Sequence, residues 1–203
     1  MPDFNGGPLA RNRGLITDDE QRLLRSARVL IAGVGGVGGR TAETLARLGI
    51  GHLRLTDPDH FCVSNLNRQA GATVHTLGQN KAAVIAELCA DVGTGTDVEF
   101  FDTGVTTTNV AAMLTDVDLV VDAIDYTVPH LSLSLARAAR DRSIPVLTAV
   151  EVGYSVWQTV LLPHGMTFER FYGLPLDVSV DDVAHGLARV PLWRLVLQRH
   201  LGE

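Results

Sequence analysis

The chain has 203 residues, of which 46% are hydrophobic and 20% are charged, and two of them are cysteines. This composition is that of a globular protein and excludes a disordered chain, a collagen and a small disulfide-stabilised scaffold. The formal net charge of −6 argues against a nucleic-acid partner and against a polybasic membrane binder. The first ten residues lack the features of a signal peptide, and no apolar run approaches the ~20 residues of a membrane span. We therefore expect a cytoplasmic protein without a membrane partner.

Strand and helix patterns alternate through residue 150. Thr17 followed by Glu20 predicts a capping box at the start of a helix over 18–26. Short apolar runs predict strands over 28–33, 52–57, 98–101, 118–124 and 145–150. Longer stretches with helical spacing predict helices over 35–48, 78–92, 108–114 and 128–142. This alternation predicts an α/β fold with a Rossmann-like, doubly wound sheet of mostly parallel strands.

The two ends of the chain depart from this alternation. Residues 1–26 are expected to form an N-terminal arm and helix, and 154–162 an antiparallel strand at the edge of the sheet. Residues 163–203 form a C-terminal extension with an amphipathic segment at 165–174 and a predicted helix around 192–200. We expect residues 1–203 to form a single domain.

Lysine is almost absent from the chain. Of the 17 basic residues, one, Lys81, is lysine and all others are arginine. An arginine excess is typical of a GC-rich genome, but this bias does not explain why one lysine is kept. Arginine replaces lysine poorly where a compact ammonium must fit, so Lys81 is a candidate functional residue.

A glycine-rich loop follows the first predicted strand. The segment GVGGVG, residues 33–38, lies between that strand and a helix, as in nucleotide-binding Rossmann folds. Asp57 ends the next strand, where an acid commonly binds a ribose hydroxyl. Dehydrogenases that use NAD and enzymes that use ATP both have such a loop. The alternative without a ligand is tight packing of the strand on the helix.

Three further features favour a polyphosphate over NAD. The loop SNLNRQ, residues 64–69, contains Arg68, which is either a phosphate clamp or a solvated arginine. Lys81 lies near a predicted helix N-terminus, where a surface cation is disfavoured unless an anion binds there too. Asp125 follows a strand end, where it is either a Mg²⁺ ligand or the N-cap of the helix that begins near Val128.

Five segments in order resemble a known family. RVLIAGVGGVG, LTDPD, VSNLNRQ, LGQNKA and VVDAID, within residues 11–162, are similar to the ThiF/MoeB/HesA superfamily of adenylating enzymes, whose fold ubiquitin-activating enzymes share. The resemblance implies that Gly36 lies against the phosphates, that Asp57 binds ribose and that Lys81 and Arg68 bind phosphates. The implied nucleotide-binding set is Gly33, Gly35, Gly36, Gly38, Asp57, Asp59, Asn65 and Gln69, and the implied catalytic set is Arg13, Arg68, Lys81 and Asp125.

The resemblance also implies the chemistry and the partners. We expect an ATP-dependent adenylyltransferase that activates a carboxylate of a ubiquitin-like or sulfur-carrier protein, a peptide or a small acid. The implied cofactors are ATP and Mg²⁺, with Asp125 as the metal ligand. Arg13 resembles an arginine that reaches into the partner's ATP site in family dimers, so we expect a homodimer. The carboxyl substrate is expected along residues 148–160.

The sequence also departs from the family pattern. It has no CxxC pair, so we expect no structural zinc, and Tyr126 stands where the family has an asparagine. Cys62 is interpreted as a packing residue, with a nucleophile as the alternative. The alternative functions are a relative of tRNA threonylcarbamoyladenosine dehydratase, a non-catalytic partner-binding subunit and an NAD-dependent oxidoreductase.

Overall fold

The computed structural model describes residues 7–152, 155–186 and 188, and the chain divides into two compact units. The first unit consists of Met1–Gly104 with Asp116–Ala123, and the second of Val105–Thr115 with Ile124–Glu203. The expectation of one domain over 1–203 stays a prediction. Within the described part of the chain, no helix is long and apolar enough to cross a membrane.

The first unit contains four parallel strands in the order β3-β2-β1-β4. In β1, Leu30 pairs with Arg54 of β2 and with Val120 of β4. β1 lies between two strands, and its residues after Arg28 are all buried, as expected for a parallel strand whose two faces are covered. The strands of this unit are β1 (Arg28–Ala32), β2 (His52–Thr56), β3 (Asp97–Phe101) and β4 (Leu119–Asp122).

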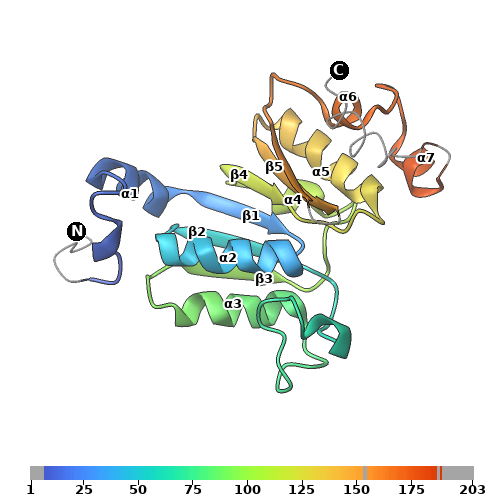
Figure 1. Ribbon diagram of the computed structural model, residues 1–203. Coiled ribbons are helices and arrows are strands. Elements are labelled where there is room, and N and C mark those ends of the chain that lie inside the picture. Colours follow the sequence, from blue (N-terminus) through green and yellow to red (C-terminus); the bar gives the residue numbers. More distant parts are fainter. Residues whose placement is uncertain (1–6, 153–154, 187, 189–203) are drawn as a thin grey trace. The chain divides into compact units, whose positions relative to one another are not determined.

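Helices of the first unit connect these strands. Helices α2 and α3 lie on one face of the sheet (Figure 1). Helix α1 begins with the predicted capping box, in which Thr17 Oγ1 accepts from the Glu20 N–H and the Glu20 carboxylate accepts from the Thr17 N–H. The helices of this unit are η1 (Ala10–Asn12), α1 (Asp18–Ser26), α2 (Gly36–Leu48), η2 (Val63–Asn65) and α3 (Lys81–Asp91).

The described residues of the second unit form an antiparallel strand pair and four helices. Strands β5 and β6 pair in a register that runs from Val146 opposite Leu161 to Val152 opposite Ser155. The prediction of an antiparallel strand near 154–162 is confirmed. The elements of this unit are α4 (Val110–Met113), α5 (Pro129–Asp141), β5 (Val146–Val152), β6 (Ser155–Leu161), α6 (Phe168–Tyr172) and α7 (Val180–Ala184).

The predicted α/β fold with parallel strands is confirmed, and the differences lie mainly at element ends. The helix predicted over 78–92 begins at Lys81, because Asn80 is its N-cap. Helix α7 was not predicted, although Ser179 caps it with its side chain and two acids follow in the first turn. The helix predicted around 192–200 lies outside the described residues.

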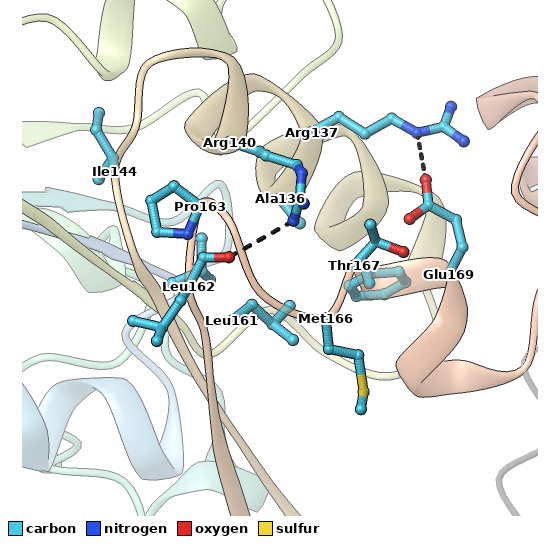
Figure 2. A pocket seen from close by; sticks show the side chains of 12 residues that line it. Ala136, Arg137, Arg140, Ile144, Leu161, Leu162, Pro163, Met166, Thr167 and Glu169 are labelled. Atoms are coloured by element: carbon cyan, nitrogen blue, oxygen red, sulfur yellow. Dashed lines mark hydrogen bonds and ion pairs between the residues drawn. The ribbon is translucent and has the colours of Figure 1, made fainter.

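Part of the C-terminal extension packs on α5. The Glu169 carboxylate accepts a hydrogen bond of 2.8 Å from Arg137 Nε, as Figure 2 shows, and the same guanidinium donates to the Val178 carbonyl. Arg140 of α5 donates to the carbonyl of Gly165 at 3.1 Å. Burial favours the neutral form of Glu169, but hydrogen bonds from its own backbone N–H, Arg137 and Thr167 outweigh it and lower its pKa. The extension is therefore fixed to α5 by an ionised, largely buried carboxylate.

We predict that Glu169→Gln lowers the free energy of unfolding by about 1–3 kcal/mol at neutral pH, because it leaves the Arg137 guanidinium without its carboxylate. Glu99→Gln is the matched control, since Glu99 pairs with Arg54 but its side chain is 54% exposed, against 8% for Glu169. Urea denaturation measures both variants. Since the folded-state pKa of Glu169 is lowered, its contribution is present above the ordinary value of 4.5 and is lost as the pH falls below it. An equal loss in the two variants would contradict the prediction.

Candidate nucleotide-binding site

The glycine loop joins β1 to α2. Gly33 has a φ of +86°, a conformation that side chains disfavour. A Cβ atom on Gly38 would lie 1.9 Å from the Gly33 carbonyl oxygen, so Gly38 is required by the packing of the loop on itself. A Cβ atom on Gly36 would meet no atom within 4 Å. The fold therefore explains Gly38, whereas Gly36 faces open space, as the predicted phosphate contact requires.

Asp57 ties this loop to the segment that follows β2. It is buried, its Oδ2 accepts from the Val34 N–H at 2.8 Å, and its Oδ1 accepts from the Asp59 N–H at 2.9 Å. Burial raises the pKa of Asp57, while the two amides and the charge of Lys81 act in the opposite direction. Asp57 thus holds the start of the glycine loop, and its role in ribose binding stays a prediction.

Lys81 is the first residue of α3, and its side chain is only 8% exposed. Its Nζ lies 2.9 Å from Asp59 Oδ2. The preceding Asn80 caps the helix through the Ala83 N–H and donates from Nδ2 to the carbonyl oxygens of Asp57 and Asp59. The structure therefore brings Lys81, Asp57 and Asp59 together with the start of the glycine loop.

The polar loop 64–69 contributes one side chain to this group. Gln69 Nε2 lies 3.5 Å from the position of a Cβ atom on Gly35, and Gln69 Oε1 is buried with no hydrogen-bond partner in the described structure. Asn65 is buried, and its Oδ1 accepts from the Cys62 N–H at 3.0 Å, which organises the loop itself. Arg68 donates to the Ser64 carbonyl at 2.7 Å. Its side chain is thus turned onto its own loop, and phosphate binding by Arg68 stays a prediction.

Two further predicted site residues, Arg13 and Asp125, are exposed. Arg13 is exposed and follows η1. Asp125 is exposed in the second unit, where its Oδ1 accepts from the Thr127 N–H at 2.9 Å. The N-cap of α5 is Val128, so the interpretation of Asp125 as that N-cap is wrong. Catalytic roles for Arg13 and Asp125 stay predictions.

The two cysteines have opposite surroundings. Cys62 is exposed, so the interpretation of Cys62 as a packing residue is wrong. A hydrogen bond with Ser64 Oγ lowers its pKa, and the N–H groups of Ser64 and Asn65 and the charge of Lys81 act in the same direction. Burial raises the pKa of Cys89 to about 12.

Asn80 is the site residue that the sequence analysis missed. It holds the carbonyls of Asp57 and Asp59 and starts the helix at Lys81. An asparagine immediately before a helical apolar pattern is a recognised N-cap signal, which would have identified it.

Comparisons with known proteins agree on one family. A family model described as the ThiF family matches residues 9–183. The tRNA threonylcarbamoyladenosine dehydratase of Escherichia coli (strain K12) is 39% identical over 133 residues, which are 65% of this chain and 49% of that protein. The sulfur carrier protein ThiS adenylyltransferase of Bacillus subtilis (strain 168) is 32% identical over 150 residues, which are 73% of this chain and 41% of that protein.

A solved structure resembles the chain as well. The crystal structure of the E. coli dehydratase TcdA in complex with ATP has a TM-score of 0.67 at 34% identity, over 72% of this chain and 61% of that chain. The chain spans about half the length of the curated relatives it matches.

We predict that Gly38→Ala and Gly36→Ala have opposite effects. Gly38→Ala lowers the free energy of unfolding by about 2 kcal/mol or more, because the new methyl group collides with backbone. Gly36→Ala keeps the stability within about 1 kcal/mol but weakens ATP binding, because the methyl group occupies the phosphate approach. Urea denaturation and ATP titration calorimetry separate the two effects. Unchanged ATP affinity in a folded Gly36→Ala variant would contradict the assignment of the glycine loop to phosphate binding.

We also predict that iodoacetamide at about pH 8 modifies Cys62 and spares Cys89, because the thiolate is the reactive form and only Cys62 is exposed with a lowered pKa. Mass spectrometry of the native protein measures the two rates. Cys62→Ser is the control and should leave the native protein unlabelled. Equal labelling of both thiols would contradict the surroundings described for them.

Proposed function

The chain belongs to the ThiF family, and we propose that it is an ATP-dependent adenylyltransferase that activates a carboxylate. One observation carries the proposal: the buried Lys81 ammonium, Asp57 and the open side of Gly36 lie around one glycine loop. This group combines a phosphate-binding cation, an acid for ribose and a backbone that a phosphate can approach. A structural relative that is 34% identical to the chain has been crystallised with ATP.

The proposed reaction transfers AMP to the substrate. A carboxylate oxygen attacks the α-phosphorus, the bond from that phosphorus to the bridging oxygen breaks, and pyrophosphate leaves with the electron pair. The protein supplies positioning and neutralises charge. Lys81, Arg68 and Arg13 of a second copy neutralise the leaving pyrophosphate. The nucleotide is held by Gly33, Gly35, Gly36, Gly38, Asp57, Asn65 and Gln69, and Asp59 lies beside Lys81 in the same group.

Asp125 is the proposed ligand for Mg²⁺. The described residues contain no group of three or more His, Cys, Asp or Glu side chains that could hold a metal. A single exposed carboxylate still suits this ion, because Mg²⁺ keeps several waters and is commonly held by one or two carboxylates together with substrate phosphates. When bound, the ion would supply charge neutralisation at the phosphates. Asp125 would orient it from the segment after β4.

Two substrate classes follow from the relatives. One relative is named for adenylylation of a sulfur carrier protein, and another for dehydration of a modified tRNA. A threonylcarbamoyl group carries a carboxylate, so adenylation could also activate it for loss of water. The net charge of −6 favours a carrier protein, peptide or small acid over RNA, because phosphate binding requires cationic surface. The higher identity to the dehydratase favours the RNA substrate as the second candidate.

The remaining parts of the proposal concern the whole protein. We propose a cytoplasmic homodimer in which residues 1–203 act as one adenylation domain, since Arg13 is expected to complete the partner's site. The alternatives are a non-catalytic partner-binding subunit and an NAD-dependent oxidoreductase. Binding of NADH with no effect of ATP would favour the oxidoreductase.

We predict that Lys81→Ala and Asp125→Ala each reduce ATP–pyrophosphate exchange at least about 100-fold, because each removes a charge from the phosphate site. Exchange of radiolabelled pyrophosphate into ATP is measured with a carrier protein ending in glycine and with tRNA carrying threonylcarbamoyladenosine. In a separate assay, hydroxylamine traps the activated acyl group. The substrate that supports exchange identifies the class.

Two controls accompany these variants. Lys81→Met keeps the buried stem of the side chain and separates loss of charge from loss of packing. Asp141→Ala removes an exposed carboxylate from the end of α5 and should leave exchange unchanged. Wild-type exchange in both folded Lys81→Ala and Asp125→Ala would overturn the site assignment.

A further inference from the structure

The Lys81 ammonium is already paired with an acidic side chain of the protein. Its side chain is 8% exposed, and among the described side chains it donates its hydrogen bond to Asp59, at 2.9 Å. The Asp59 side chain is 67% exposed. A buried cation is therefore held by an acid that lies largely in solvent.

The backbone fixes Asp59 in this position. Its N–H donates to Asp57 Oδ1 at 2.9 Å, and its carbonyl accepts from the Lys81 N–H at 2.9 Å and from Asn80 Nδ2 at 3.2 Å. Asp59 thus joins the end of β2 to the first turn of α3 through its backbone. Its carboxylate is placed beside Nζ by this framework and not by a flexible loop.

Electrostatics explains why such an acid is needed. Lys81 lies at the N-terminus of α3, where the helix dipole disfavours a cation. Burial adds to this cost unless the ammonium is paired. Asp57 also feels the charge of Lys81, but both of its oxygens accept from backbone amides. Asp59 is therefore the carboxylate that pairs directly with the ammonium.

We infer that Asp59 is a positioning residue that acts on the nucleotide through Lys81, in contrast to the sequence expectation that it binds the nucleotide itself. This inference rests on the proposed function. Asp59 orients and stabilises the buried ammonium so that it points to the phosphates without a rearrangement when ATP binds. A carboxylate that instead only repelled the phosphates would have the opposite effect on ATP affinity.

A double-mutant cycle on the full chain tests this. Asp59→Ala is expected to lower kcat/KM for pyrophosphate exchange about 10- to 100-fold, the usual effect of misplacing a catalytic group by about an ångström. In the Lys81→Met background the same change should cost less than about 2-fold, because the residue through which it acts is gone. Asp59→Glu should restore part of the activity. Asp91→Ala, at the other end of α3, is the matched control and should leave exchange unchanged.

Two outcomes of the cycle would overturn the inference. If Asp59→Ala lowers kcat/KM as much in the Lys81→Met background as in the wild type, Asp59 acts on the nucleotide or metal directly. Tighter ATP binding by Asp59→Ala would mean that Asp59 repels the phosphates. If Asp59→Ala does not fold, Asp59→Asn replaces it in the cycle, since the amide has nearly the shape of the carboxylate but lacks its charge.

The single lysine supplies a readout that needs no turnover. Protein labelled with ¹³C and ¹⁵N lysine gives one side-chain signal, because Lys81 is the only lysine. In the ligand-free protein, Asp59→Asn should shift this signal and accelerate exchange of the ammonium protons. An unchanged signal would overturn the inference even if exchange activity is found. Absence of ATP binding and exchange in the wild type, with the signal still sensitive to Asp59, would count against the proposed function alone.

Discussion

The arrangement of the candidate site depends on the two hydrogen bonds that Asp57 accepts from backbone amides. One fixes Val34 at the start of the glycine loop, and the other fixes Asp59 in the segment after β2. A carboxylate is suited to this task because it is acceptor-only when ionised and can serve two amides with its two oxygens. Asp57 thereby links the glycine loop to Asp59, whose carbonyl accepts from the Lys81 N–H in the first turn of α3.

Parallel strands explain why these segments meet. The carboxyl ends of β1 and β2 lie at the same edge of the sheet, so the glycine loop and Asp57 emerge side by side. The start of helix α3 is held at this edge because Asn80 Nδ2 donates hydrogen bonds to the carbonyls of Asp57 and Asp59. In the middle of the long irregular segment between β2 and α3, Gln69 Nε2 lies 3.5 Å from the position of a Cβ atom on Gly35. Backbone hydrogen bonds and close packing thus assemble polar groups that are distant in the chain.

Sequence patterns predicted what depends on period and composition, and missed what depends on tertiary contacts. Alternating strands and helices, the Thr17 capping box and the glycine loop follow from local rules, and the structure contains them. The exposure of Cys62 could not be read from its neighbours, because the loop around it is folded by Asn65 and not by a repeating pattern. The pairing of Lys81 with Asp59 likewise joins residues 22 positions apart.

The pairing also explains why a chain rich in arginine keeps a lysine at position 81. An arginine there would carry a planar fork with five donors, and a side chain 8% exposed would have to find partners for all of them. An ammonium has three donors around a point, so one can bind Asp59 while the others remain for phosphate oxygens. Under the proposed function, a compact cation must serve both Asp59 and a phosphate from a buried position, and this requirement separates Lys81 from the arginines of the chain. A GC-rich genome can account for the number of arginines, and the geometry around position 81 accounts for the single lysine.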